Sequence, residues 1–275
     1  MTDRSVLITG CSSGIGRCVA DGLAVRGYRV FATARKPEDV ARLQADGLES
    51  LQLDLSSSSS IAAAADEVLA RTGGKLYALF NNGAYGQPGA VEDLSRALLR
   101  ELFETNLFGR HELTNRGLPV RRRQGHGRII HNSSVLGFVA LPFRGAYVAS
   151  KYALEGLTDT LRLELRDTDI HVVLVQPGPI ISRFRANAYA AFKRNIDSET
   201  SAYRDSYRVM ERRLTTEGPV VPFTLPPEAV LRKVTHALES NKPRARYYVT
   251  FPTYLFATLK RLLPQKILDR ILASI

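Results

Sequence analysis

The chain has 275 residues, of which 44% are hydrophobic and 24% are charged, and its formal net charge is +11 at pH 7. This composition is typical of a globular protein and excludes disordered and collagen-like chains. No apolar run reaches the roughly 20 residues of a membrane span, and the short apolar stretch after the Met1 start is too small for a secretory leader. We therefore expect one domain over residues 1–275.

The charge distribution and the cysteines indicate which partners and which cellular compartment to expect. Arg121–Arg123 is the densest basic run, and we expect a solvated turn there rather than a nucleic-acid site, because no aromatic residues interleave with it to stack on bases. The only cysteines, Cys11 and Cys18, are seven residues apart across a glycine loop, which is poor geometry for a disulfide. We expect a reducing, cytoplasmic location and no metal site.

Strand-like and helix-like segments alternate along the chain. This order predicts an α/β fold with a doubly wound parallel sheet of about seven strands, the Rossmann fold. The expected strands are Val6–Ile8, Val30–Ala32, Leu51–Leu53, Leu76–Phe80, Arg128–His131, Val172–Val175 and Arg246–Phe251.

Helices are predicted between these strands. Ile61–Ala70 follows a serine cluster, Ser56–Ser60, that would cap it. Three further helices are expected at Ser95–Gly117, Tyr147–Arg166 and Pro227–Ser240. In Tyr147–Arg166 a stripe of leucines recurs every three or four residues and indicates either core or a subunit contact; it comprises Leu154, Leu157, Leu161 and Leu165.

Two segments near the end of the chain break the alternation. Residues 180–225 are polar and lack a clear strand, which indicates a lid over the substrate or partial disorder. Residues 254–275 form a basic amphipathic pattern interrupted at Pro264. This tail either lies on an anionic membrane surface or packs against the domain or a second subunit.

The first strand leads into a loop with glycines at 10, 14 and 16 and then into a helix. Glycines allow the tight turn and the close approach of the backbone to a pyrophosphate, and the helix N-terminus provides free N–H groups for the phosphates. The sequence therefore predicts a dinucleotide site at Gly10, Ser12, Ser13, Gly14, Ile15 and Gly16.

The end of the second strand indicates which dinucleotide binds. An acidic residue there accepts from the ribose hydroxyls of NAD, whereas a basic one pairs with the 2′-phosphate of NADP. Here the chain reads Ala32-Thr33-Ala34-Arg35-Lys36, with no acid. We therefore predict NADP(H), held by Arg35 with help from Arg17 or Lys36.

Several motifs then follow in a fixed order. Asn81-Asn82-Gly83-Ala84 ends the fourth strand and Asn106 lies in the next helix, while Ser134 ends the fifth strand, thirteen residues before Tyr147. Lys151 follows four residues later, and Pro177-Gly178 closes the sixth strand. Together with the glycine loop, this set resembles the short-chain dehydrogenase/reductase family over residues 4–182. The family usually has Asn-Asn-Ala-Gly where this chain has Gly83-Ala84, and threonine where it has Ser182.

Residues four apart lie on one face of a helix, so the Lys151 ammonium is expected beside the Tyr147 hydroxyl. A free phenol has a pKa near 10, and a nearby cation stabilises the phenolate. Tyr147 would then act as general acid in reduction and as general base in oxidation.

The resemblance implies roles for the other site residues. Ser134 would hydrogen-bond the substrate oxygen, Lys151 would also hold the nicotinamide ribose, and Asn106 would position a water in the proton relay. Asp54 would contact the adenine amine, although an acidic helix cap is an equally simple interpretation. The remaining cofactor contacts implied are Asn82, Tyr147, Pro177, Gly178, Ile180 and Ser182.

The resemblance is strongest to retinol and hydroxysteroid dehydrogenases and to bacterial NADP-dependent aldehyde reductases, through Gly145–Leu154 and Pro177–Ile180. It implies an apolar aldehyde, ketone or alcohol substrate, reduction as the working direction, and a homodimer or homotetramer. Two alternatives remain, a noncatalytic NADP(H)-binding regulator and an epimerase or dehydratase. Candidate pocket walls are Tyr85, Leu136, Phe138, Leu141, Phe184 and Tyr189.

Overall fold

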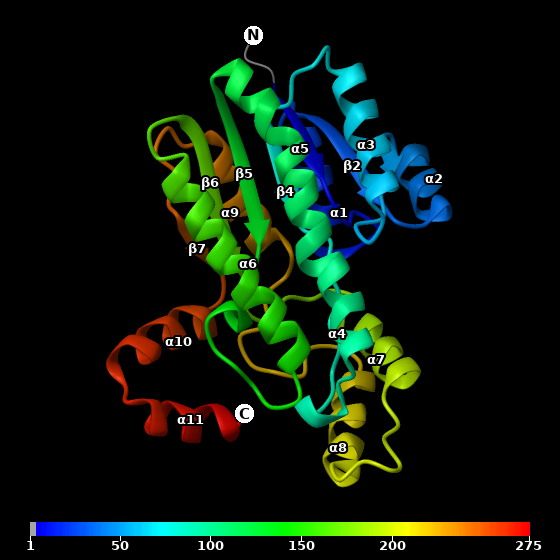
Figure 1. Cartoon of the computed structure of the whole chain (residues 1–275), viewed down its shortest axis with the longest axis vertical. Helices are drawn as coiled ribbons and strands as arrows, with labels where there is room; N and C mark the ends of the chain where they lie inside the picture. Colours follow the sequence, from blue (N-terminus) through cyan, green and yellow to red (C-terminus); the bar gives the residue numbers. More distant parts are fainter. Residues whose placement is uncertain (1–3) are drawn as a thin grey trace.

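A parallel sheet forms the centre of the molecule (Figure 1). The structure, a computed structural model, describes residues 4–275. The strand order is β3-β2-β1-β4-β5-β6-β7, and every neighbouring pair is parallel. The chain winds outward in both directions from β1 and β4, which confirms the predicted doubly wound fold. The strands are β1 Ser5–Ile8, β2 Arg29–Ala34, β3 Glu49–Gln52, β4 Ala78–Asn81, β5 His126–Asn132, β6 Asp169–Gln176 and β7 Arg246–Tyr248.

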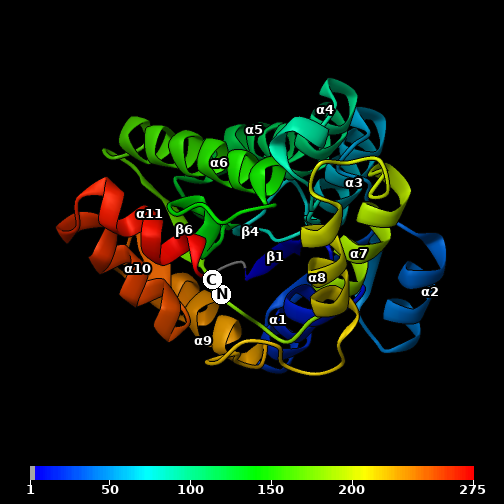
Figure 2. The same ribbon diagram turned by 90° about the horizontal axis from the view of Figure 1, so that it is seen from below.

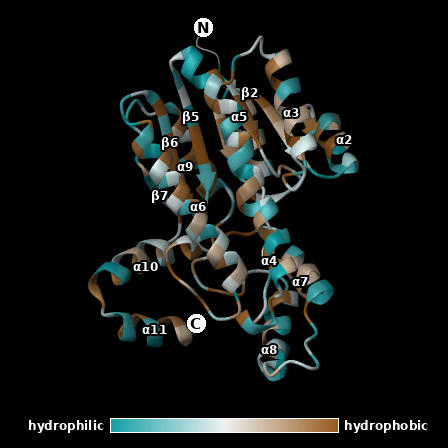
Figure 3. Ribbon diagram, in the orientation of Figure 1, coloured by the Kyte–Doolittle hydropathy of each residue, from teal (hydrophilic) through white to brown (hydrophobic). Residues whose placement is uncertain are grey.

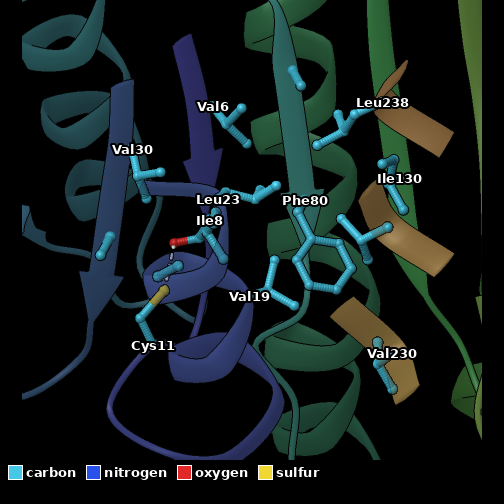
Figure 4. Packing of buried hydrophobic residues seen from close by; sticks show 14 of the residues in the cluster. Val6, Ile8, Cys11, Val19, Leu23, Val30, Phe80, Ile130, Val230 and Leu238 are labelled. Atoms are coloured by element: carbon cyan, nitrogen blue, oxygen red, sulfur yellow. Dashed lines mark hydrogen bonds between the residues drawn. The ribbon is translucent and has the colours of Figure 1, made fainter. Parts of the chain in front are cut away.

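Helices cover both faces of the sheet (Figure 2). On one face lie α1 (Gly14–Val25), α2 (Pro37–Ala45) and α9 (Glu228–Glu239). On the other lie α3 (Ser58–Arg71), α5 (Gly109–Gln124) and α6 (Gly145–Glu164). Figure 4 shows the first face, where α1 and α9 side chains meet those of the central strands. Figure 3 shows apolar residues gathered in the middle of the sheet, where both faces of the strands are buried.

The predicted helix at Ser95–Gly117 differs from what forms. It is α4 (Arg96–Phe103), a π-helical turn (Glu104–Phe108) and then α5, which continues to Gln124. The basic run therefore lies in the last turn of α5, and the expectation of a solvated turn is wrong for its first residue. Arg121 is fully buried, because the missing side chain of Gly127 leaves room for its stem: a Cβ there would lie 2.6 Å from the Arg121 Cδ.

Residues 180–225 include two helices that pack against the domain. They contain α7 (Phe184–Asn195) and α8 (Arg204–Thr215). Phe192 of α7 and Tyr207 of α8 stack edge to face at 5.1 Å, in an apolar cluster with Leu98 and Leu102 of α4. Helices rather than strands form the backbone hydrogen bonds of residues 180–225, and apolar contacts hold these helices against the domain.

The tail forms two helices separated at Pro264, as predicted: α10 (Phe251–Leu262) and α11 (Gln265–Ala273). Leu268 and Leu272 of α11 are buried against Val139 in the loop after β5, so the tail packs against its own domain. Within residues 4–275, no helix has the length and apolar character needed to cross a membrane.

Candidate active site

The predicted site residues meet at one edge of the sheet, where the carboxyl ends of β1, β4, β5 and β6 lie beside the start of α1 (Figure 2). This is the edge at which the strand order reverses, and loops that diverge there leave a crevice for a ligand. The motifs come from segments up to 170 residues apart along the chain, and the parallel sheet brings them together.

The glycine loop has the shape that a dinucleotide needs. Gly10 and Gly14 have φ of +72° and +58°, which other residues rarely adopt. A Cβ on Gly16 would lie 2.1 Å from the Gly10 carbonyl oxygen, so the loop closes on itself only with glycine. No side chain caps the first turn of α1, where Ser13 is the N-cap, and no acidic residue lies in that turn. Its free N–H groups therefore fit the phosphates of a dinucleotide.

A hydrogen-bond network joins this loop to the turn after β4. Thr9 Oγ1 accepts from the backbone N–H groups of Asn82 and Gly83, both at 2.9 Å. Asn82 Nδ2 donates to the carbonyls of Thr9 and Gly10, at 3.0 and 3.2 Å, and Asn82 Oδ1 accepts from Asn132 at 2.9 Å. Asn82 thus fixes the loops after β1, β4 and β5 relative to one another.

The basic residues near the end of β2 differ in what they are free to do. Arg17 pairs with Asp21 and Asp46, each at 2.7 Å, so its guanidinium is already neutralised and the expected help from it has no support. Lys36 lies 3.5 Å from Glu38. The exposed guanidinium of Arg35 makes no hydrogen bond or ion pair within residues 4–275.

Asp54 lies in the turn before α3 but is not the cap of that helix. Its Oδ1 accepts from the backbone N–H and the hydroxyl of Ser56, at 2.9 and 2.7 Å. It closes the turn before α3, whose N-cap Ser57 accepts from the Ser60 N–H, which confirms the serine cap. No contact in the structure addresses a role for Asp54 toward adenine.

The catalytic candidates surround the first turns of α6. Ser134 is two residues past the end of β5, and its side chain is a hydrogen-bond partner of the Tyr147 hydroxyl that favours the phenolate. Lys151 is one turn further along and fully buried, with its Nζ 5.4 Å from the centre of the Tyr147 ring. This ammonium donates to the Asn132 carbonyl at 2.8 Å, so β5 positions it directly.

The protonation of Tyr147 differs from the expectation. Enclosure of the hydroxyl by protein raises its pKa to about 12, while the positive charge of Arg110 and the hydrogen bond from Ser134 act in the opposite direction. Burial also holds the pKa of Lys151 well below its usual value, and the nearby Arg110 adds to that effect. Tyr147 is thus a phenol in the free enzyme, ready to donate a proton rather than to accept one.

Asn106 lies in the π-helical turn between α4 and α5 and is fully buried. Its amide exchanges two hydrogen bonds with the Tyr85 backbone, at 3.1 and 2.9 Å, and donates to Ser150 Oγ at 3.3 Å. Ser150 in turn donates to the Tyr147 carbonyl at 2.8 Å. Single π turns often occur at functional sites, and this one turns Asn106 toward α6.

The segment after β6 also lies at this edge. The Pro177 carbonyl accepts from the Val135 N–H at 2.8 Å, which joins the loops after β5 and β6. Gly178 packs so closely on Thr250 that a Cβ would lie 2.2 Å from its Oγ1. Ser182 lies against the glycine loop, since a Cβ on Gly14 would be 2.9 Å from the Ser182 Cβ.

The candidate pocket walls separate into two groups. Phe184 meets the Tyr147 ring edge to face at 5.3 Å, and Tyr85 and Tyr189 pack in the cluster formed with α7 and α8. These three remain candidates. The other three pack in the cluster with α10 and α11 instead, and they are Leu136, Phe138 and Leu141.

Sequence reasoning missed Arg110 and His131, which lie beneath the catalytic residues. Both side chains are buried. Arg110 follows the Asn106-Leu107-Phe108-Gly109 run, and His131 is in β5 with its Nδ1 3.3 Å from Asn81 Nδ2. The available signals were a histidine directly after the apolar pair Ile129-Ile130 and a basic residue next to a site motif.

Comparisons with known proteins agree with this geometry. Residues 4–192 match the short chain dehydrogenase family. The chain is 45% identical over 269 residues to an uncharacterized oxidoreductase of Escherichia coli, YbbO, covering 98% of this chain and 94% of the relative. It is 34% identical to human retinol dehydrogenase 8, covering 94% and 85%. A short-chain dehydrogenase structure from Streptomyces avermitilis superposes with a TM-score of 0.78 at 29% identity, covering 94% and 92%. The chain therefore belongs to the short-chain dehydrogenase/reductase family, the NAD(P)-dependent oxidoreductases that act on CH–OH and C=O groups.

Proposed function

We propose that this protein is an NADP(H)-dependent carbonyl reductase that acts on apolar aldehydes or ketones, including retinoid- or steroid-like ones. The observation that carries the proposal is the Tyr147 hydroxyl, bonded to Ser134 and flanked by Lys151, at the edge of the sheet that holds the glycine cradle. The bound dinucleotide supplies the hydride. Tyr147 donates its proton to the substrate oxygen, and Ser134 hydrogen-bonds the same oxygen and orients it.

The proton that leaves Tyr147 has to be replaced from solvent. Lys151 and Asn106 lie on the two sides of the first turn of α6, and Asn106 reaches it through Ser150. We assign Asn106 to positioning a water and Lys151 to passing the proton toward Tyr147 and to holding the nicotinamide ribose. A chain of buried hydrogen bonds transfers protons without admitting bulk water to the reacting carbon.

The preference for NADP(H) rests on Arg35. Its exposed, unpaired guanidinium follows the last residue of β2, Ala34, where a 2′-phosphate would lie. We expect Arg35→Ala to raise KM for NADPH at least tenfold and to leave KM for NADH nearly unchanged. Lys36→Ala is the matched control, because Lys36 already pairs with Glu38. A wild-type preference for NADH that persists in Arg35→Ala would overturn the assignment.

The apolar substrate class has two supports. Phe184 places aromatic surface beside Tyr147, with Tyr85 and Tyr189 in the cluster of α7 and α8, and one relative bears the name retinol dehydrogenase. A panel of aldehydes, ketones and alcohols followed by NADPH absorbance, with Tyr147→Phe as control, tests the reaction. NADPH binding without turnover of any compound would indicate a regulator, and a product formed without net NADPH consumption would indicate an epimerase or dehydratase.

We propose a homodimer or homotetramer that uses the outer face of α6, where Leu157 and Leu163 are 45% and 63% exposed. For the tail we favour packing within the domain over membrane binding, because Leu268 and Leu272 are already buried. Flotation with anionic liposomes, with and without residues 254–275, tests this choice. Liposome binding that disappears with the tail would reverse it.

A further inference from the structure

Arg110 is the second residue of α5 and is completely buried beneath the catalytic residues. Its Nε and Nη2 donate to the Gly83 carbonyl at 3.0 and 2.7 Å, and Nη2 also donates to the Asn82 carbonyl at 2.9 Å. Its Nη1 donates to the Asn132 carbonyl at 3.0 Å. One guanidinium thus holds the ends of β4 and β5, which carry the two asparagines that shape the site.

The Asn132 carbonyl has a second donor, the Lys151 ammonium at 2.8 Å. Two basic side chains therefore meet at one oxygen atom. Neither forms an ion pair within residues 4–275, since every acceptor of the Arg110 guanidinium is a backbone carbonyl. Buried cations are normally paired with an acid, so this arrangement leaves positive charge unbalanced in the core.

The groups that face this charge are few. Tyr147 and Lys151 come from α6, and His131 comes from β5. Glu155, one turn beyond Lys151 on α6, is bonded to Gln176 at 2.8 and 2.9 Å. Within this set, Tyr147 is the group whose ionisation would create a new negative charge beside Arg110, and it is the proposed proton-transfer residue.

We propose that Arg110 is a positioning residue that aligns the Asn132 carbonyl for Lys151 and provides a permanent positive charge that favours the Tyr147 phenolate during alcohol oxidation. The proposal rests on the function assigned above to Tyr147. Lysine can lose its proton when buried, whereas arginine keeps its charge. Burial lowers the pKa of Arg110 only to about 10, so near neutral pH it stays cationic whichever protonation state Lys151 adopts.

The sign of the effect follows from electrostatics. Removing a fixed positive charge makes the loss of any further proton from the cluster less favourable, so each macroscopic pKa of the Tyr147 and Lys151 pair rises. An opposite charge within about 4 to 6 Å shifts a pKa by about one to three units. Replacement of Arg110 by a neutral residue is expected to move the rising limb of the kcat profile for alcohol oxidation up by about one pH unit, which is about a tenfold lower rate near neutral pH.

The same helix provides a matched control. Arg121 is also completely buried, donates only to the Gly117 carbonyl at 3.0 Å, and lies at the other end of α5. Arg121→Gln removes a buried guanidinium without touching the site. We compare it with Arg110→Gln, which retains an amide donor and thus protects folding, and with Arg110→Met, which retains none.

Both neutral Arg110 variants should show the same upward shift in the pH midpoint, with a lower plateau in Arg110→Met, while Arg121→Gln keeps the wild-type midpoint. Equal midpoints in all three variants, with only the plateau or the melting temperature changed, would overturn the proposal and leave Arg110 a purely structural residue. Tyr147→Phe tests the proposed function separately, with NADPH binding as the check that the variant is folded. If Tyr147→Phe binds NADPH and still turns over substrate, the proposed function is wrong. A failure that concerns Arg110 alone leaves Tyr147→Phe inactive.

A readout without turnover comes from stability. The pKa of Lys151 is depressed in the folded protein, so the unfolded chain binds more protons and the free energy of unfolding rises with pH until the unfolded pKa is reached. Arg110→Gln lets the folded pKa rise, so its total gain in stability, as the pH rises from below the folded pKa to the unfolded one, should be smaller than that of Arg121→Gln. Identical gains in the two variants would contradict an electrostatic role for Arg110.

Discussion

The inner and outer walls of the site are stabilised by different forces. The inner wall, formed by the ends of β1, β4 and β5, is a network of hydrogen bonds from side chains to backbone, such as Asn82 to Thr9 and Lys151 to Asn132. The outer wall, formed by α7 and α8, is held mainly by apolar packing. Hydrogen bonds fix distances and angles, whereas apolar contacts tolerate exchange of side chains. We therefore expect the chemistry at the inner wall and the start of α6 that packs beside it, and substrate fit at the outer wall.

The largest test of this division compares Tyr147→Phe with Phe184→Ala. Loss of the Tyr147 hydroxyl removes the proton donor and should lower kcat by about 10²- to 10⁴-fold, with NADPH affinity retained. Phe184 packs against that ring but has no group that can donate a proton. Its truncation should therefore raise the substrate KM roughly tenfold and change kcat little. Steady-state kinetics on both variants measures the split, and a collapse of kcat in Phe184→Ala would assign chemistry to the outer wall.

The same division explains which features the sequence predicted. The glycine loop, Ser134, Tyr147 and Lys151 were found because each combines a residue type with a fixed place at a strand end or helix face. The order of α7 and α8, and the packing of Leu136 and Phe138 on the tail, depend on contacts between distant apolar side chains. A single sequence does not indicate such pairings.

The π turn and Arg110 were missed for a further reason. An extra residue in a helical turn has no periodic signature of its own, so the predicted helix ran on through Asn106. Arg110 would be taken for a surface residue by type, because arginine is almost never fully buried without a partner. Its burial depends on three backbone carbonyls from two strands, which only the folded sheet brings together.

His131 tests whether the buried basic groups beside the inner wall lower the free energy of unfolding in acid. Burial and the positive charges of Arg110 and Lys151 lower its pKa to about 3. Between that value and the unfolded value near 6.5 the unfolded chain binds more protons, so stability falls as the pH falls through this window. The loss amounts to about 2 to 3 kcal/mol at pH 4.5.

Denaturant titrations at pH 7 and pH 4.5 measure this loss. His131→Asn should lose about 2 kcal/mol less between the two pH values than the wild type does, even if it starts from lower stability. His126→Asn is the control, because His126 is at the first position of β5 and is not among the groups whose charge acts on His131. Equal acid sensitivity in the wild type and His131→Asn would show that other groups govern acid unfolding.

The tail offers a test in which the expected change in stability is of similar size but the activity of the site should not change. Leu268 of α11 is buried against Val139, and Leu268→Ala should lower the free energy of unfolding by about 2 kcal/mol. Its neighbour Ile267 is 44% exposed, so Ile267→Ala should change stability by less than about 0.5 kcal/mol. Well below the melting temperature, both variants should retain wild-type kcat. A fall in kcat in Leu268→Ala alone would mean that the tail controls the loop after Ser134.

The smallest expected effect comes from comparing two glycines that the sequence alone does not distinguish but whose surroundings differ. A Cβ on Gly16 would meet the Gly10 carbonyl at 2.1 Å, whereas a Cβ on Gly156, exposed in the middle of α6, would meet nothing within 4 Å. Gly156→Ala should therefore raise the free energy of unfolding by about 0.5 to 1 kcal/mol through helix propensity, and Gly16→Ala should weaken NADPH binding. Gly156 adjoins the exposed Leu157 on the face proposed for self-association. Loss of stability in Gly156→Ala, together with a lower oligomeric state in sedimentation, would mean that a second copy approaches α6 too closely for a methyl group.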